Sequence, residues 1–508
     1  MLTGRGAGQT PVLRAGQRKK LKEFTGKQDN LRTDSNLVHY NEWTRFGGEE
    51  MLHRANRSYE LDMTHGKLIP KVAAFAVPLM LTSILQLLYN AADVIVVGRC
   101  TGKEALAAVG STASLINLIV NVFLGLSVGT NVVAARYYGA GDYRGTQETV
   151  HTSIFISLIG GVAIGVFGFI FGGTFLEWMG SPESVLPLAT QYIRIYFIGM
   201  PFNMLYNFGA AVLRAVGDTR RPLYFLTLSG LVNVLLNLLF VIGFHMGVAG
   251  VALATIISQM ISAALVTICL IRTDGFVHLD LKKLRVHADK LAAISKIGLP
   301  AGFQGACFSI SNVLIQSTVN SYGDVVVAGN SASQNLEGFI YASMNAFHQA
   351  AITFVSTNIG AGKNSRIRKS LGATSLLVTL VGVVLGGLAV LFMRPLVSIY
   401  NSEPEVIAAG VRRLRIIAGT YFLCGLMDVF CGILRGMGAA MVPMFVSIMG
   451  ACAFRIFWIY AILPLNPSLE MLYYSYPVSW VLTGGVHLIC CLVLMRRFPV
   501  HREQEELT

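Results

Sequence analysis

The stretch that decides the fold is Pro78–Gly98, PLMLTSILQLLYNAADVIVVG. It is almost entirely apolar, yet it contains one carboxylate, Asp93. Gln86, Asn90 and Asp93 are spaced i, i+4 and i+7, which places them on one face of a helix. An ionisable side chain at membrane depth is costly, and it usually faces a bundle interior or an aqueous cavity. We therefore expect Asp93 to be a switchable charge on a membrane-spanning helix that Pro78 bends.

The composition predicts an all-α protein that crosses the membrane many times. Of the 508 residues, 54% are apolar and only 13% are charged, which is too few charges to cover a soluble protein of this size. The mean hydropathy is +0.59. The formal net charge of +13 is better explained by basic loops on one side of a bilayer than by nucleic-acid binding. No basic platform with interleaved aromatic residues supports a nucleic-acid partner.

The sequence motifs predict neither a metal centre nor a nucleotide-dependent enzyme. The eight cysteines are scattered without a CxxC pair, so they are expected to be small core residues. The string GAGKNS at 360–365 lacks the first glycine of a phosphate-binding loop and the hydroxyl residue that follows its lysine. We therefore expect no cofactor and no ATPase activity.

Twelve apolar segments from Leu68 onward are long enough to span a bilayer. Their approximate limits are 69–97, 107–135, 150–172, 187–213, 222–243, 248–271, 293–319, 326–359, 371–393, 407–434, 441–464 and 471–495. Alternate loops are rich in lysine and arginine, so the positive-inside rule places those loops and both termini in the cytoplasm of a cell-membrane protein. Arg412, Arg413 and Arg415 break this pattern near the outer end of the tenth segment, where we expect them to snorkel or to pair.

The two halves of the chain repeat each other at an offset of about 220 residues. The matching strings are PLMLTSILQ and PAGFQGACF, STAS and NSAS, YYGAGD and NIGAGK, and LRAVGDTRRP and LRGMGAAMVP. This predicts two pseudo-symmetric six-helix lobes, 68–271 and 293–495, in parallel orientation around a cytoplasmic linker, 272–292. The polar segment 1–67 is expected to be a disordered tail, or to reflect a start codon assigned too far upstream of Met51 or Met63. Residues 496–508 form a cytoplasmic tail.

Further polar side chains lie in the apolar segments, and each has two interpretations. Asn233 and Asn237 share a helix face, either as neutral acceptors in a proton or Na+ network or as interhelical hydrogen bonds worth about 0.6 kcal/mol each. Asp93 either titrates or ties the first helix to Asn233. Asp428 and Arg455 either face substrate or form a buried structural pair, which we favour because buried charges are normally paired. His348 and His487 are expected to be isolated packing residues.

The motifs together resemble those of the multidrug and toxic compound extrusion (MATE) transporters, over about residues 63–495. The string LYNAADVIVVG, the paired GAG turns and the paired LR-x-x-G-x-x-x-x-P motifs account for this resemblance. It implies a V-shaped pair of lobes that export organic, often cationic, compounds in exchange for H+ or Na+ by alternating access. It also implies a cation site, which could hold Na+ at Asp93, made by Gln86, Asp93, Asn207, Asn233, Asn237 and Thr255.

The chain departs from this family pattern at two places. Many relatives have a second carboxylate where Asn237 stands, which puts Na+ coordination by two carboxylates in doubt. Another branch of the family uses acids near the positions of Phe308 and Cys424, and neither residue has a carboxyl group.

We accordingly expect a monomeric secondary antiporter for amphipathic organic compounds, with the bilayer and small molecules as its partners. The alternatives are a flippase of lipids or lipid-linked sugars from the same superfamily, and a membrane receptor or scaffold without transport.

Overall fold

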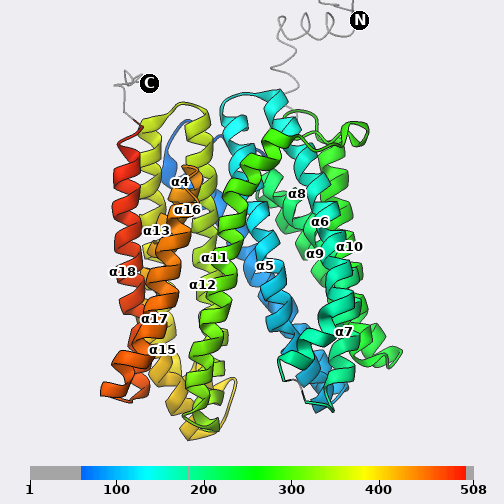
Figure 1. Cartoon of the computed structure of the whole chain (residues 1–508), viewed down its shortest axis with the longest axis vertical. Coiled ribbons are helices and arrows are strands. Elements are labelled where there is room, and N and C mark those ends of the chain that lie inside the picture. Colours follow the sequence, from blue (N-terminus) through cyan, green and yellow to red (C-terminus); the bar gives the residue numbers. More distant parts are fainter. Residues whose placement is uncertain (1–58, 181, 499–508) are drawn as a thin grey trace, which may run out of the picture. The chain divides into compact units, whose positions relative to one another are not determined.

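The computed structural model describes residues 59–180 and 182–498, and within these ranges the regular structure is entirely helical. The long helices lie side by side along the vertical axis of Figure 1. The first half of the chain contains α4 (Leu68–Cys100), α5 (Lys103–Gly139), α6 (Tyr143–Trp178), α7 (Leu186–Ile198), α8 (Met200–Ala215), α9 (Arg220–Asn237), the π-helix η1 (Leu238–Gly243) and α10 (Gly247–Arg272).

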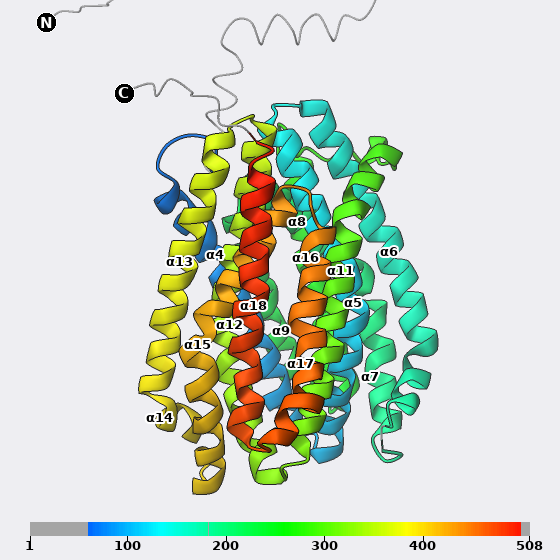
Figure 2. The same ribbon diagram turned by 60° about the vertical axis from the view of Figure 1, so that its left-hand side comes forward.

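The second half repeats this order after a short 3-10 helix, η2 (Leu281–Lys283). Its helices are shown from a second side in Figure 2. They are α11 (Ala288–Asn320), α12 (Asp324–Gly360), α13 (Asn364–Leu391), α14 (Met393–Ser398), α15 (Pro404–Gly436), α16 (Met441–Ser447), the π-helix η3 (Ile448–Ala453), α17 (Phe454–Phe457), the π-helix η4 (Trp458–Ile462), the 3-10 helix η5 (Leu463–Leu465) and α18 (Leu469–Met495).

Each of the twelve predicted segments coincides with a helix or with a run of consecutive helices. Nine of these, within the described residues, are long and apolar enough to cross a membrane. The fourth segment is divided at Gly199 into α7 and α8, and α11 and α12 are long but contain more polar residues. The all-α membrane fold is confirmed, whereas the count of twelve spans stays a prediction.

The paired GAG motifs form equivalent turns after α5 and after α12. Gly141 and Gly362, the second glycine of each motif, both have φ +70°, a conformation that glycine adopts without strain. After the first turn, the Asp142 side chain caps α6 by accepting a hydrogen bond from the Gly145 amide. Both turns lie at the end of the helices that is uppermost in Figure 1, together with the basic loops.

The two halves meet along a seam of glycines, where α5 packs against α11. A Cβ atom on Gly125 would overlap the backbone of Gly302, and one on Gly302 would overlap the backbone of Val122. Gly125 and Gly129 on α5 face Gly298 and Gly302 on α11, which is the small-xxx-small pattern of closely packed membrane helices.

At the end of α5 the same close approach occurs against α12. A Cβ atom on Gly139 would overlap the carbonyl oxygen of Thr357, and one on Gly360 would overlap the carbonyl oxygen of Arg136. The halves are therefore in backbone contact at the end where the basic loops lie.

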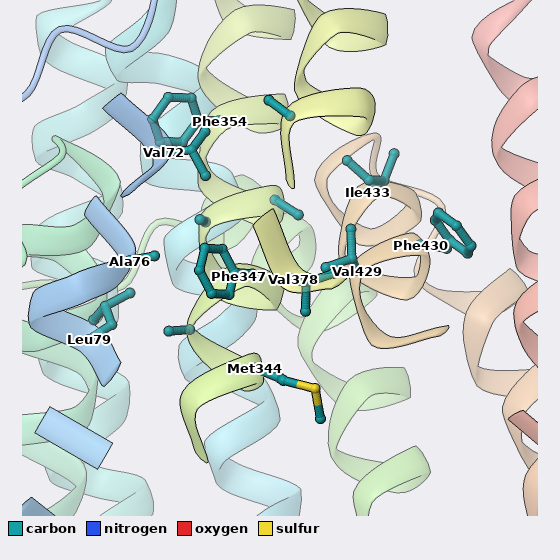
Figure 3. Packing of buried hydrophobic residues seen from close by; sticks show 14 of the residues in the cluster. Val72, Ala76, Leu79, Met344, Phe347, Phe354, Val378, Val429, Phe430 and Ile433 are labelled. Carbon is teal, nitrogen blue, oxygen red and sulfur yellow. The ribbon is translucent and has the colours of Figure 1, made fainter. Parts of the chain in front are cut away.

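The first turns of helix α4 pack against the apolar core of the second half. They point Val72, Ala76 and Leu79 toward Phe347 and Phe354 of α12, as Figure 3 shows. Further along, α4 contacts α9 instead. The helix continues through Pro78 without a break, so the bend predicted there stays a prediction.

The predicted tails and linker contain more structure than expected. Residues 1–58 and 499–508, and with them most of both predicted tails, lie outside the described residues. The segment Tyr59–Lys67 makes specific contacts, so the expectation of disorder is wrong for the end of the N-terminal tail. In the linker, Val277 and Leu279 are fully buried against α8 and α10.

Candidate functional site

Asp93 lies on α4 where this helix packs against α9. The side-chain amide of Asn237 donates a short hydrogen bond to Asp93 Oδ1, and it donates a second one, of 3.3 Å, to Asn233 Oδ1. The predicted tie between the first helix and Asn233 is therefore wrong in its partner, because Asn237 contacts the carboxylate directly. The three side chains form one connected polar cluster inside the first half.

Asn237 stands at a break in regular helix geometry. It is the last residue of α9, and the π-helix η1 begins at Leu238. Asn237 is fully buried, and its Oδ1 atom accepts no hydrogen bond. A buried acceptor without a donor is costly, and short π-helical stretches are frequent at functional sites. Both features therefore mark this position as a candidate ligand position beside Asp93.

The groups around Asp93 are neutral. The hydroxyls of Tyr192 and Tyr196, on α7, interact electrostatically with the carboxylate. The buried Oε1 atom of Gln259, on α10, is another acceptor without a donor. Within the described part of the chain, no lysine, arginine or histidine forms an ion pair with Asp93. Asp93 is thus a half-buried acid whose charge is balanced by no cation among the described side chains.

Three residues of the predicted cation site are not bonded to this cluster. Gln86 is exposed, two turns before Asp93 on α4. Asn207 donates to Asn203, at 2.9 Å to its carbonyl oxygen and 3.1 Å to its Oδ1. Thr255 donates to the carbonyl oxygen of Val251 at 3.0 Å. The structure therefore joins Asp93, Asn233 and Asn237, whereas the part of the other three in a site stays a prediction.

In the second half, Asp428 and Arg455 do not form the predicted ion pair. The Nε atom of Arg455 donates to Ser479 at 2.9 Å, and its guanidinium lies 4.4 Å from the centre of the Tyr476 ring. The Asp428 side chain interacts with Tyr341 instead. Arg455 therefore interacts with the Ser479 hydroxyl and the Tyr476 ring, and not with the Asp428 carboxylate that the sequence interpretation assigned to it.

Among the described residues of the second half, Glu337 and Arg413 form a buried ion pair. The sequence interpretation allowed Arg413 to snorkel or to pair, but it did not name Glu337 as the partner. Arg413 donates from Nε and Nη2 to the two carboxylate oxygens of Glu337, at 2.9 and 2.7 Å, and from Nη1 to Asn330 at 2.7 Å. Glu337 is 5% exposed and Arg413 is 3% exposed. Glu337 is an acid within a predicted span, which was the signal that could have revealed it.

The two histidines of the second half are not isolated, contrary to expectation. His348 contacts the carbonyl oxygen of Asp428 at 2.6 Å and the guanidinium of Arg435 at 3.3 Å. Arg435 also donates to Gln304 at 2.9 Å. From Gln304 the network continues through Ser447 to His487. These buried groups connect α11, α12, α15, α16 and α18.

In residues 59–180 and 182–498, no three histidine, cysteine or acidic side chains lie together so that they could hold a metal ion. Any cation at Asp93 would therefore depend on amide, hydroxyl and backbone oxygens beside the one carboxylate.

The similarity of the chain to a known family is itself repeated, once in each half. The MatE family profile matches residues 78–239 and again residues 300–461. The two matches are offset by 222 residues (300 − 78), in agreement with the repeat in the sequence. The chain belongs to the MatE family.

Among similar proteins of this family, the probable multidrug resistance protein YpnP of Bacillus subtilis is 32% identical over 74% of this chain and 84% of its own length. The FAD transporter of Shewanella oneidensis is 24% identical over 68% of this chain and 77% of its own length. A solved structure of a MOP superfamily transporter from Pyrococcus furiosus matches with a TM-score of 0.82. It is 20% identical, over 87% of this chain and 99% of that chain, so it supports the fold alone.

The MatE matches and the apolar helices identify the chain as a multi-pass membrane transporter of small molecules, with the two-lobed fold of the family. They confirm the family that the motifs of the sequence resemble.

Proposed function

We propose that the protein is a secondary antiporter that exports amphipathic organic compounds, often cationic ones, in exchange for H+ or Na+ bound at Asp93. A single chain would perform the cycle as a monomer by alternating access. The basic loops and both termini would face the cytoplasm, in accordance with the positive-inside rule.

One observation supports this proposal above the others, namely the environment of Asp93. The carboxylate lies at membrane depth, accepts a hydrogen bond from the Asn237 amide, and has no cationic partner among the described side chains. A carboxylate that no protein cation balances can be neutralised by a proton, by Na+ or by a cationic substrate. Such intramembrane acids typically mark ion pathways.

Mutually exclusive occupation of Asp93 would couple the two fluxes. With a proton or Na+ bound, the site is neutral and has no affinity for a cation. Once the ion is lost, the charge returns and substrate is drawn in. With one proton exchanged per substrate, a difference of one pH unit amounts to about 1.36 kcal/mol, which is about a tenfold concentration ratio.

Na+ remains an alternative to H+ because of the oxygens near Asp93. The Oδ1 atoms of Asn233 and Asn237 lie in the cluster, and that of Asn237 has no donor. Hard cations prefer oxygen ligands. The π-helix that follows Asn237 interrupts regular α-helical hydrogen bonding, and transporters often place ion-binding carbonyls at such irregular backbone.

The test is transport by the purified full chain in vesicles, with imposed proton and sodium gradients applied separately. The substrate panel should contain amphipathic organic cations and FAD, since the names of the relatives include both multidrug resistance and FAD transport. We expect uptake of at least one compound against its gradient, and substrate-induced release of H+ or Na+. Uptake of every compound that stays independent of both gradients would contradict the proposal.

A further inference from the structure

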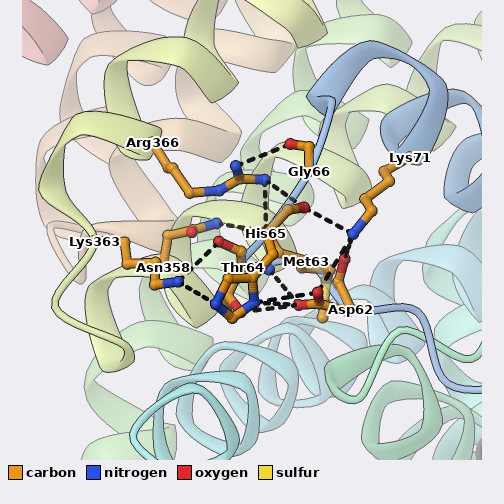
Figure 4. Close-up of polar contacts among 9 residues, drawn as sticks. All are labelled: Asp62, Met63, Thr64, His65, Gly66, Lys71, Asn358, Lys363 and Arg366. Carbon is orange, nitrogen blue, oxygen red and sulfur yellow. Dashed lines mark hydrogen bonds and ion pairs between the residues drawn. The ribbon is translucent and has the colours of Figure 1, made fainter. Parts of the chain in front are cut away.

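The segment Tyr59–Gly66, which we call the strap, precedes α4 in the chain and contacts both halves of the molecule. The strap runs across the ends of the helices where the basic loops lie. Figure 4 shows the contacts of Asp62 to Gly66. The strap belongs to neither predicted lobe, and the transport mechanism proposed above does not use it.

The second part of the strap is fixed to the second half. Met63 is 1% exposed and packs into the core formed by α12, α13 and α15. Its carbonyl oxygen accepts hydrogen bonds from Asn358 at 3.2 Å and from Arg366 at 3.3 Å. Lys363 contacts the His65 ring at 2.7 Å.

Arg366 and Lys363 extend this attachment along the strap backbone. Arg366 also donates to the carbonyl oxygens of His65, at 3.1 Å, and of Gly66, at 3.0 Å, while Lys363 donates to that of Thr64 at 3.2 Å. A buried side chain and bonds to four consecutive carbonyl groups, Met63–Gly66, therefore hold this part in place.

The first part of the strap contacts the first half beyond α4, and none of its three residues is fully buried. The Tyr138 hydroxyl, at the end of α5, donates to the Glu60 carboxylate at 3.3 Å. The Arg221 guanidinium lies 5.4 Å from the centre of the Tyr59 ring, and this tyrosine is 42% exposed. Gly217, with φ +88°, leaves room for the backbone of Leu61, which a Cβ atom would overlap.

The two attachments differ in how easily they can separate. The contact with the second half combines a buried side chain with several charge-assisted hydrogen bonds, which are the stronger kind. Lys71 of α4 also donates to the strap, at 2.6 Å to the carbonyl oxygen of Asp62 and 2.7 Å to that of His65, but the first turns of α4 pack against α12 of the second half.

Beyond α4, the contacts with the first half include the Tyr138–Glu60 hydrogen bond, the attraction between Arg221 and Glu60, the cation–π contact of Tyr59 and backbone packing against a glycine, none of which involves a fully buried side chain of the strap. Movement of the halves should therefore break the contacts of Tyr59–Leu61 and leave those of Met63–Gly66 intact.

We propose that the strap is a latch that holds the halves together at the end with the basic loops, and that its Tyr59–Leu61 part must leave the first half each time this end opens. The inference rests on the proposed alternating-access function. It assigns the strap a role in the conformational cycle in addition to ion coupling at Asp93.

The test uses reducible cross-linking of two cysteine pairs, in a background where the eight native cysteines are replaced by serine. One pair, Glu60→Cys with Tyr138→Cys, joins the strap to the first half. The control pair, His65→Cys with Lys363→Cys, joins the strap to the second half. A short bis-methanethiosulfonate linker is applied to each purified full-length variant, and substrate transport in vesicles is measured before and after reduction.

We expect cross-linking of Glu60→Cys to Tyr138→Cys to lower transport at least tenfold, and reduction to restore it. Cross-linking of His65→Cys to Lys363→Cys should leave transport within twofold of the untreated variant. Unchanged transport with the first pair cross-linked, or equal inhibition by both pairs, would overturn the latch. Lack of transport by the parent protein before cross-linking would instead count against the proposed function.

Discussion

The acids Asp93 and Glu337 each lie within a predicted membrane span, one in each half, but their partners differ. Glu337, in the second half, is bound through both oxygens by Arg413 and is almost fully buried. Asp93, in the first half, is bound by the amide of Asn237 and is half-buried. An arginine cannot release its proton in a protein, so the charge of Glu337 is permanently balanced. No arginine or lysine among the described side chains balances the charge of Asp93 in this way.

This difference in partners predicts a structural role for Glu337 and a role in transport for Asp93. Removal of one member of a buried ion pair leaves the other charge uncompensated, so the Glu337–Arg413 pair should matter for stability. An acid held by a neutral amide can gain or lose a cation while its neighbours stay in place. Asp93 should therefore matter for coupling, and less for folding.

The largest expected effect is on transport, in Asp93→Asn. This change leaves a side chain of equal size that cannot bind a proton or balance a cation. We expect gradient-driven accumulation of substrate in vesicles to fall from about tenfold per pH unit to about onefold. Asp93→Glu is the matched control and should retain part of the coupling. If Asp93→Asn accumulates substrate to the same ratio as the parent, Asp93 is not needed for coupling, and the proposed difference between Asp93 and Glu337 is wrong.

The second prediction concerns stability, in Glu337→Gln. Because Arg413 would be left as an uncompensated buried charge, we expect a loss of about 3–5 kcal/mol in the free energy of unfolding. The measurement is thermal or denaturant unfolding in detergent. Adding Arg413→Gln should recover part of the loss.

An exposed ion pair provides the control for this measurement. Arg412 and Glu470 lie 3.9 Å apart and are both largely exposed, so Glu470→Gln should cost about 0–1 kcal/mol. Equal effects of Glu337→Gln and Glu470→Gln would show that burial of the first pair has no energetic consequence.

The third prediction sharpens the role of the amide beside Asp93. Asn237→Val removes the hydrogen bond to the carboxylate and leaves Asn233 in place. Since a hydrogen bond to a charged group contributes about 1.5–3 kcal/mol, we expect transport to slow by roughly tenfold or more while the protein remains folded. The measurement is the initial rate of ion-coupled transport. Loss of folding, instead of rate, would make Asn237 a structural residue like Arg413.

The smallest effect is expected at Asp62, an exposed acid of the strap. Burial alone would raise its pKa, but hydrogen bonds from Thr64 and the charges of Lys71 and His65 outweigh burial and lower the pKa to about 2. Stability from a lowered carboxyl pKa is present above the unfolded value of 3.8 and is lost only as the pH falls toward 2. Because histidine side chains typically change charge at about pH 6.5, and His65 lies next to Asp62, the comparison belongs above that value: the small difference in thermal midpoint between Asp62→Asn and the parent should be the same at pH 7.5 and pH 9.0. A difference that changes between these pH values would contradict this.

The sequence predicted the parts of the fold that depend on local pattern. Apolar length located the helices, and the repeated GAG and LR-x-x-G motifs located two similar halves, because these features require only neighbouring residues. The importance of Asp93 was also visible, since a lone acid in an apolar run is conspicuous.

Contacts between distant segments could not be predicted in the same way. Asp93 was paired with Asn233, one helical turn from its actual partner, because both asparagines share a face of α9 and pattern alone does not rank them. Arg455 was paired with Asp428 by charge, whereas the structure places its guanidinium on the face of Tyr476. The strap was invisible for the same reason, because Met63 is buried by residues nearly three hundred positions away, as at Asn358.

The close approaches made by Gly139 and by Gly360 have a consequence for how the molecule originated. Gly139 lies on Thr357 and Gly360 lies on Arg136, and the two offsets are equal (360 − 139 = 221 and 357 − 136 = 221). This is the reciprocal geometry of a two-fold dimer, in which residue i meets residue j and j meets i. Two identical copies of a half-length ancestor would form the contact twice from one sequence. Fusion of two such genes would therefore preserve the interface, while residues away from it were free to diverge, as they have at Asp93 in one half and at the Glu337–Arg413 pair in the other.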